Sequence, residues 1–252
     1  MTFVYSLQLS MHKLPKLDPN SRDFDLIYTD NDPWMVLKSP FFDVHVNLLK
    51  GKIKDCDFQR GIDIGCGSGI LTNAIHVAKE LDGIDYSNSA IELAKSLRSD
   101  INFYVLDMRS LNQIPTGKYD VVTCFEVLYY IDSHDAKRNV SSEISRIGSD
   151  KCIYFFSLVT CGDLNDRNYF NYYTAVSFLS EIFEILETQN WTLHDEQFSF
   201  PNKVIKKLLS FSEALRTKYL LRLMGSANHE SSFQTLFICR QKRHQICTKF
   251  PD

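Results

Sequence analysis

A short glycine-rich segment carries the strongest chemical signal in the sequence. The run GIDIGCGSGI spans residues 61–70, and Asp63 precedes three glycines at alternate positions, Gly65, Gly67 and Gly69. Glycine tolerates positive φ angles and lets the backbone approach a ligand, because no Cβ stands in the way. A helix that starts after the turn would present free N–H groups to the same ligand. The segment therefore predicts a turn that cradles a nucleotide-type molecule.

The spacing of the glycines distinguishes two kinds of nucleotide turn. The dinucleotide fingerprint Gly-x-Gly-x-x-Gly, counted from Gly65, requires a glycine at position 70, where this chain has Ile70. The third glycine is Gly69 instead, and Gly-x-Gly-x-Gly after an acid is the pattern of S-adenosylmethionine (SAM) sites. The segment thus favours SAM and disfavours a nicotinamide-dependent oxidoreductase.

Further side chains at later strand ends would complete the same site. Asp85 follows Gly65 by 20 residues, where an acid can accept hydrogen bonds from both ribose hydroxyls. Asp107 can accept a hydrogen bond from an adenine amino group, and Met108 beside it can cover the ring. Trp34 and Tyr28 could close over the cofactor, or Trp34 could anchor the N-terminal segment. The cofactor-binding set that we expect is Trp34, Asp63, Gly65, Cys66, Gly67, Gly69, Asp85, Tyr86, Asp107, Met108 and Glu126.

The elements that must position these residues follow from the alternation of apolar runs and amphipathic stretches. The strand-like runs are residues 61–64, 81–85, 101–107, 119–125, 152–159, 191–200 and 233–239. Strands that alternate with helices are typical of a parallel sheet with helices on both faces, which binds ligands outside the carboxyl ends of its strands. We therefore predict an α/β fold with a doubly wound, mostly parallel, seven-stranded sheet.

Two helix starts are visible in the sequence. Ser89 and Glu92 have the spacing of a capping box at the start of the helix after the second strand. Asp132 is the expected cap of the helix after the fourth strand, with Ser133 competing for that role.

The segments that flank this pattern define the expected domain organisation. Residues 1–57 are interpreted as an N-terminal cover with a helix broken near Pro40, and residues 58–240 as the main domain. A helix is expected at about 174–187. The stretch 202–224 is interpreted as an inserted amphipathic helix with a net charge of +5. Its basic face is solvated, or the helix caps the acceptor cleft, attracts an anionic or nucleotide-linked acceptor, or contacts a membrane surface.

Composition excludes several other classes of protein. The chain has 252 residues, of which 44% are hydrophobic and 23% charged, as in ordinary globular domains, and its net charge of −3 gives no overall basic field for nucleic acid. The longest apolar run, 152–159, is far below the roughly 20 residues of a membrane span. Seven cysteines show no zinc-site spacing, so we expect free thiols, no metal and a cytoplasmic location. Residues 241–252 are a basic tail.

Together the motifs resemble those of class I SAM-dependent methyltransferases over about residues 58–160. The resemblance rests on residues 63–69, 83–85 and 120–131 and on Asp107. It implies a Rossmann-like fold, SAM as the methyl donor and S-adenosylhomocysteine as the product.

A narrower resemblance to the nodulation-type N-methyltransferases, which methylate an amino sugar, rests on three short segments. These are Asp32-Pro33-Trp34, Ser39-Pro40-Phe41 and the run EVLYYI at residues 126–131. The chain departs from that family at Phe42, where the family tends to have an acid, and in the helix at 202–224. The departures point to a relative with a different acceptor.

Methyl transfer is an in-line displacement, so the protein must mainly align the reacting atoms and exclude water. An amine acceptor must be neutral, and a carboxylate, histidine or tyrosine can take its proton. The candidates are Glu126, Tyr129, Tyr130 and His134. Glu126 would hold the methionine end of SAM or the acceptor amine. For each of the other three residues, the alternative to a catalytic role is a structural one, in packing of the site wall or at the start of a helix.

The favoured function is methylation of a small molecule: a sugar, an amino sugar or a related metabolite amine or hydroxyl. An RNA or protein acceptor is the first alternative. The fourth strand lacks the Asn/Asp-Pro-Pro-Tyr/Phe motif of nucleic-acid amino methylation, while the basic stretch 202–224 and the tail keep nucleic acid open. A SAM-binding protein without catalysis is the second alternative, and the intact motif set argues against it. The oligomeric state is left open.

Overall fold

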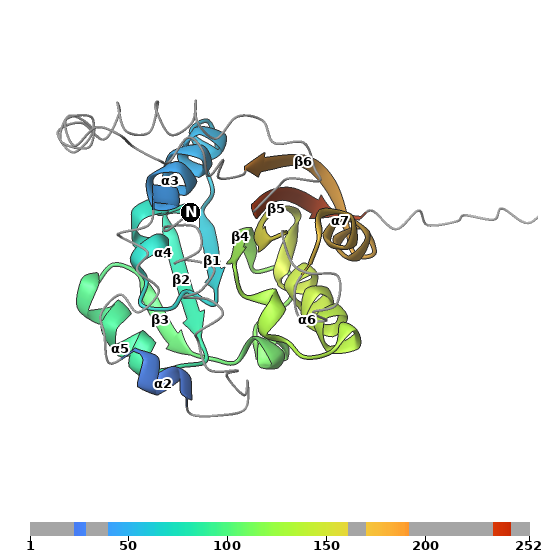
Figure 1. Cartoon of the computed structure of the whole chain (residues 1–252). Coiled ribbons are helices and arrows are strands. Elements are labelled where there is room, and N and C mark those ends of the chain that lie inside the picture. Colours follow the sequence, from blue (N-terminus) through green and yellow to red (C-terminus); the bar gives the residue numbers. More distant parts are fainter. Residues whose placement is uncertain (1–22, 29–39, 161–169, 192–233, 243–252) are drawn as a thin grey trace, which may run out of the picture.

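The computed structural model describes residues 23–28, 40–160, 170–191 and 234–242 (Figure 1). Within them a seven-stranded sheet has the strand order β3-β2-β1-β4-β5-β7-β6. The strands are β1 Arg60–Ile64, β2 Glu80–Asp85, β3 Asn102–Val105, β4 Tyr119–Phe125, β5 Gly148–Val159, β6 Phe183–Trp191 and β7 Gln234–Gln241. The first five pair in parallel, and β7 lies antiparallel between β5 and β6. The predicted doubly wound, mostly parallel sheet is confirmed.

Helices cover both faces of this sheet. They are α2 Asp23–Ile27, α3 Pro40–Ile53, α4 Ile70–Ile75, α5 Asn88–Leu97, α6 His134–Ile147 and α7 Tyr172–Ser180, with short 3-10 turns η2 Met108–Gln113 and η3 Leu128–Tyr130. Residues of α3, α4 and α5 join one buried cluster, and residues of α6, α7 and η2 join the other. The central strands β4 and β5 are buried along most of their length, as expected for strands with helices on both faces of the sheet.

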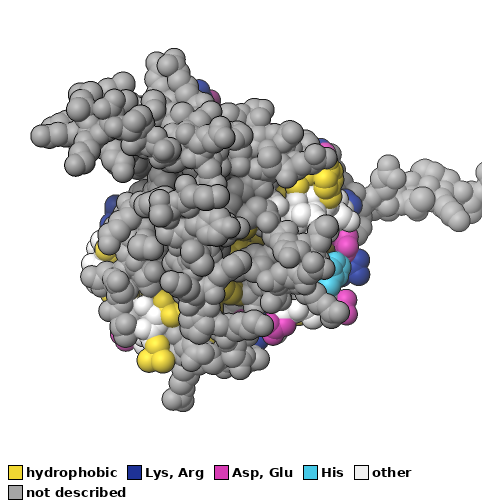
Figure 2. Space-filling model, in the orientation of Figure 1, with side chains coloured by type: hydrophobic (Ala, Val, Ile, Leu, Met, Phe, Trp, Pro, Cys, Tyr) yellow, Lys and Arg dark blue, Asp and Glu magenta, His cyan; other side chains and the backbone are white. Residues whose placement is uncertain are grey.

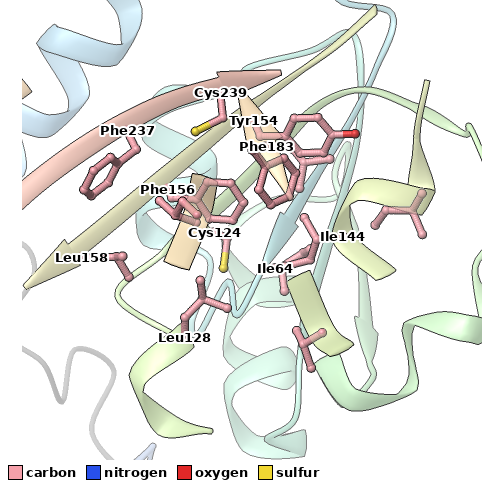
Figure 3. Packing of buried hydrophobic residues seen from close by; sticks show 14 of the residues in the cluster. Ile64, Cys124, Leu128, Ile144, Tyr154, Phe156, Leu158, Phe183, Phe237 and Cys239 are labelled. Atoms are coloured by element: carbon pink, nitrogen blue, oxygen red, sulfur yellow. The ribbon is translucent and has the colours of Figure 1, made fainter. Parts of the chain in front are cut away.

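Aromatic rings tie the far strands into this core. The rings of Tyr154 and Phe156 on β5 lie 4.8 and 5.1 Å from the ring of Phe183 at the start of β6 (Figure 3). All three side chains are buried. Aromatic pairs at such distances stabilise a core beyond the area that they bury, so β5 and β6 are held together across the intervening β7.

The predicted helix at about 174–187 was wrong in its second half, because α7 ends at Ser180 and β6 already begins at Phe183. The predicted strand at 191–200 lies, beyond Trp191, outside the described residues. The backbone N–H groups of Glu181 and Ile182 close the helix by 3-10 bonds of 3.2 Å to Phe178 and Leu179. From residue 183 to residue 186, more buried and more exposed side chains alternate, as in a strand. The spacing of the apolar residues in this segment also fits a short helix, so the sequence pattern alone is ambiguous.

Both predicted helix caps lie one or two residues from the observed ones. Ser87, not Ser89, caps α5, because its side chain accepts a hydrogen bond from the backbone N–H of Ala90. Ser133, not Asp132, caps α6 in the same way. Pro40 does not break a helix but occupies the first position of α3, where its missing N–H costs nothing.

The predicted N-terminal cover is described at α2 and α3 only. Val46 and Leu49 of α3 are buried in the same cluster as α4 and α5, so this helix belongs to the helical layer of the sheet. Trp34, the stretch 202–224 and the tail from residue 243 onward lie outside the described residues. No helix of the described part has the length and apolar character that a membrane span needs.

Candidate functional site

The carboxyl ends of β1, β2 and β4 lie side by side at one edge of the sheet. Ile64 of β1 pairs with Ile84 of β2 on one side and with Cys124 of β4 on the other. Because the three strands are parallel, the chain leaves them at neighbouring points (Figure 1). The glycine turn, Asp85 and Glu126 therefore emerge at the same edge, as the sequence predicts for a ligand site.

The glycine turn has the backbone conformation that its composition requires. Gly65, Gly67 and Gly69 have φ angles of 73°, 53° and 73°, in the left-handed region that favours glycine. The N–H of Gly65 donates to the Ile84 carbonyl at 2.8 Å, which ties the turn to β2. A Cβ on Gly65 would lie 2.4 Å from the side chain of Val127, so the turn packs directly against the segment that follows β4.

Asp85 joins the turn to the end of β2. Its carboxylate accepts hydrogen bonds of 2.9 Å from the backbone N–H of Gly67 and from that of Ser87. Burial raises the pKa of Asp85 despite these two donors. One carboxylate thus fixes two loops of the site, and carboxylate oxygens have further lone pairs for a ligand hydroxyl.

Asp63 is a fully enclosed carboxyl group on β1. It accepts a hydrogen bond from the Thr72 hydroxyl of α4 and another, at 2.7 Å, from the Thr123 hydroxyl of β4. Burial raises its pKa to about 6. No lysine or arginine of the described residues forms an ion pair with it, so its charge is offset only by neutral donors.

Glu126 is the residue that leaves β4, and its backbone is strained. Its φ angle is 57°, a left-handed value that a residue with a side chain seldom adopts. The carboxylate accepts hydrogen bonds from Ser157 Oγ at 2.6 Å, from the Val159 N–H at 3.1 Å and from Gln234 Nε2. Burial raises the pKa of Glu126 as well. Strained backbone of this kind persists where the surrounding structure holds it and is frequent at functional sites.

The charges of this edge fit a cationic ligand. Asp63, Asp85 and Glu126 are carboxyl groups whose pKa burial raises, and none of them has an ion pair within the described part of the chain. A buried charge without a counter-charge costs several kcal/mol, and a bound cation would offset that cost. The residues therefore fit SAM, whose ammonium and sulfonium groups are positive and whose ribose carries two hydroxyls.

Comparison with known protein families gives the same assignment. Residues 62–148, which run from β1 to the start of β5, match the family described as a methyltransferase domain. The chain therefore resembles methyltransferases over residues 62–148. The matched residues include the glycine turn, Asp85 and Glu126.

Curated relatives and solved structures add to this comparison. The ubiquinone biosynthesis O-methyltransferase of Burkholderia vietnamiensis is 38% identical over 80 residues. The chain spans about a third of the length of this relative: the match covers 30% of this chain and 34% of that protein. The N-methyltransferase NodS of Bradyrhizobium japonicum, in complex with S-adenosyl-L-homocysteine, superposes with a TM-score of 0.64 at 16% identity and covers 90% of this chain and 100% of its own.

A third similar structure shows that the fold alone does not determine the reaction. The [4+2]-cyclase SpnF matches 79% of this chain and 81% of its own with a TM-score of 0.57 and 16% identity. Residues of the site, and not the fold, must therefore carry any assignment of activity.

The predicted adenine-side residues are present but differently engaged. Asp107 caps η2, and its carboxylate accepts hydrogen bonds from the backbone and the guanidinium of Arg109. Burial alone would raise the pKa of Asp107, but the hydrogen bonds from Arg109 outweigh it and lower the pKa. Met108 packs partly against the core, and Tyr86 is exposed beside Asp85. Cys66 is buried, and burial strongly raises the pKa of its thiol.

The four residues that we predicted to handle the acceptor do not all lie together. Tyr129 and Tyr130 lie in η3, a few residues after Glu126. Tyr129 is buried, and its ring centroid lies 4.7 Å from that of Tyr130. His134 instead begins α6, with its Nε2 3.8 Å from a carboxylate oxygen of Glu181. Glu181 also pairs with Arg138, on the charged side of α6 and α7 (Figure 2). The structure therefore groups Glu126 with the two tyrosines and places His134 with α7.

Sequence reasoning missed Phe24 and Asp25 of α2, although it named Tyr28, directly after this helix, as a residue that could close over the cofactor. Asp25 accepts hydrogen bonds from the Ser87 hydroxyl at 2.6 Å and from the Ser89 N–H at 3.2 Å, next to Asp85. The Tyr28 hydroxyl lies 2.6 Å from the position of a Cβ on Gly67, and Phe24 meets Tyr130 edge to face at 5.5 Å. These residues precede the glycine turn by some 40 positions and match no motif, so only the pattern of a short apolar and acidic segment could have indicated them.

The buried state of Asp63 predicts a pH-dependent stability. Because its pKa is about 6 in the folded protein and about 4 in an unfolded chain, the native state binds this proton more tightly between those values. The free energy of unfolding should therefore fall as the pH rises from about 4 to about 6, by up to about 3 kcal/mol relative to the Asp63→Asn variant. Urea unfolding of both apo-proteins between pH 4.5 and 7.5 measures the difference, and parallel pH curves would contradict it.

Proposed function

We propose that this protein is a SAM-dependent methyltransferase that acts on a nitrogen or oxygen atom of a small molecule. The observation that carries the proposal is the set of three buried carboxyl groups, Asp63, Asp85 and Glu126, around a left-handed glycine turn at one sheet edge. The match of residues 62–148 to the methyltransferase domain supports the same function.

The cofactor residues have distinct roles in this proposal. Asp85 would accept hydrogen bonds from the ribose hydroxyls, while Asp63 and Glu126 would balance the positive charge of the methionine end. Asp107 would orient the adenine amino group, and Met108 would cover the ring. SAM, when bound, supplies a methyl group that the positively charged sulfur activates for transfer, without a covalent enzyme intermediate.

The acceptor side of the site would be built around the end of β4. Glu126, Tyr129 and Tyr130 are the polar side chains that leave this strand end together. The Glu126 carboxylate can hold an acceptor amine or hydroxyl and accept its proton, because its raised pKa makes it a better base than an exposed glutamate. The two tyrosines would exclude water, and Phe24 of α2 packs onto Tyr130 from the outside.

A sugar or amino sugar is the acceptor class that we favour. The segments at residues 32–34, 39–41 and 126–131 support it, since they resemble the nodulation-type N-methyltransferases. A hydroxyl acceptor is the second candidate, favoured by the 38% identity to a ubiquinone biosynthesis O-methyltransferase over 80 residues. The two candidates predict different methylated atoms.

Incubation of the purified protein with metabolite extracts and SAM that carries a deuterated methyl group tests the function. We expect a small molecule that gains the heavy methyl group by mass spectrometry, and fragmentation of the product then distinguishes N-methyl from O-methyl. A parallel reaction with the Asp85→Ala variant provides the control that should give no product.

Three outcomes would contradict the proposal. Heavy label that appears only in RNA or only in protein would exclude the small-molecule acceptor and support the first alternative. Binding of SAM without label transfer to any fraction would support a non-catalytic SAM-binding protein. Absence of SAM binding to the wild-type protein would exclude the cofactor assignment itself.

A further inference from the structure

Glu126 belongs to a buried polar cluster whose other members lie outside the methyltransferase domain match. The cluster contains Ser157 at the end of β5 and Gln234 at the start of β7, and both are buried. We propose that Gln234 is a positioning residue that, together with Ser157, sets the orientation of the Glu126 carboxylate. The inference rests on the proposed function, because Glu126 is the acceptor-side carboxylate there.

The hydrogen bonds of the cluster form a closed triangle. Gln234 Nε2 donates to Glu126 Oε1 and also to Ser157 Oγ at 3.1 Å. The Ser157 hydroxyl donates in turn to the same Glu126 oxygen at 2.6 Å. Each member therefore constrains the other two, and chains of hydrogen bonds in a buried place strengthen one another.

The backbone of Glu126 depends on the same two strands. Its N–H donates to the Ser157 carbonyl at 2.9 Å, and its second carboxylate oxygen accepts from the Val159 N–H at 3.1 Å. The left-handed φ of 57° needs such support, because an unsupported residue would relax to an ordinary conformation. Loss of one of these hydrogen bonds should thus change the direction of the Glu126 carboxylate and also weaken the stabilisation of its negative charge.

The antiparallel direction of β7 explains how a residue 108 positions away reaches the site. Gln234 pairs with Val159 across β5 and β7, so β7 begins at the edge where β5 ends. Thr235, the next residue, is hydrogen-bonded to Thr160 at 3.0 Å and to the Asn190 side chain at 2.7 Å. These bonds anchor the start of β7 to both neighbouring strands and hold Gln234 in register with Glu126.

A double-mutant cycle tests this coupling. The variants are Gln234→Met, which keeps the chain length and removes the amide, Glu126→Gln, and their combination. Gln189→Met on β6 makes the same chemical change outside the triangle and serves as the matched control. Three quantities are measured: the free energy of unfolding of the apo-protein in urea, the SAM dissociation constant by calorimetry, and kcat and KM with the acceptor found by label transfer.

If Gln234 acts through Glu126, the Gln234→Met variant should lower kcat/KM about tenfold, as expected for a lost hydrogen bond to a buried charge. The same substitution in the Glu126→Gln background should change kcat/KM by less than about twofold, and the two substitutions should be non-additive in apo-protein unfolding. The Gln189→Met control should stay within about twofold of the wild type.

Equal losses in both backgrounds, with additive unfolding free energies, would overturn the positioning role. Failure of the proposed function looks different, because the wild-type protein itself would then bind no SAM or transfer no label. In that case the unfolding cycle still decides the coupling: additive values reject it and non-additive values support it.

Discussion

Replacing Asp85 with alanine should abolish the increase in melting temperature that SAM gives the wild-type protein. The variant loses the carboxylate that would bind both ribose hydroxyls and that holds the Gly67 and Ser87 N–H groups. Hydrogen bonds to a charged group contribute about 1.5–3 kcal/mol each, so the SAM dissociation constant should rise at least about a hundredfold. Thermal unfolding with and without SAM, each compared with the variant's own apo-protein, measures the effect.

Asp82→Asn is the matched control for this prediction. Asp82 lies on the same strand, but its carboxylate binds Lys118 at 2.9 Å and the Tyr119 hydroxyl at 2.7 Å. Its loss can lower the stability of the apo-protein, yet the SAM-induced shift should remain. An Asp85→Ala variant that keeps the full shift would show that the ribose is bound elsewhere.

Gly65→Ala should disrupt the site by a steric route. A left-handed φ of 73° costs alanine about 1–2 kcal/mol, and the new Cβ would lie 2.4 Å from the Val127 side chain. The overlap would push the glycine turn away from the segment after β4, which carries Glu126. We expect a loss of more than about 2 kcal/mol in unfolding free energy, beyond the conformational cost alone, and no measurable SAM binding by calorimetry.

Gly117→Ala separates the two causes of that loss. Gly117 has a similar φ of 67°, but nothing lies within 4 Å of the Cβ position. The free energy of unfolding of this variant should therefore fall only by the conformational cost of about 1–2 kcal/mol, and the variant should bind SAM normally. If Gly65→Ala behaves like Gly117→Ala in both measurements, the contact between the turn and Val127 contributes neither to stability nor to SAM binding.

The position of the glycine turn and Asp85 at one sheet edge was predictable because its information is local. Glycines at 65, 67 and 69 and the acid at 85 must stand directly after strands, and parallel strands bring all such positions to one edge. The register of β1 with β2 and β4 confirms this arrangement. Helix caps were less predictable, because Ser87 and Ser89 have nearly equal local chemistry and only the packing of α5 decides between them.

The acceptor side could not be predicted in the same way. Glu126 was identified from its place after β4, but its partners Ser157 and Gln234 come from β5 and from an antiparallel strand 108 residues away. No local pattern encodes that β7 inserts between β5 and β6. The wrong helix prediction for residues 183–187 had the same origin, since residues 183–191 are held as a strand by pairing with β7.

The position of β7 has a consequence for synthesis of the chain on the ribosome. Strands β1 to β5 can pair as they emerge, but β6 hydrogen-bonds only to β7, within the described sheet. Until residues 234–241 are made, the apolar β5 has an open edge and β6 has no neighbour, and open apolar edges favour association with other chains. A nascent chain that stalls before β7 is therefore the form most prone to aggregate, although β1 to β5 and the glycine turn are already made.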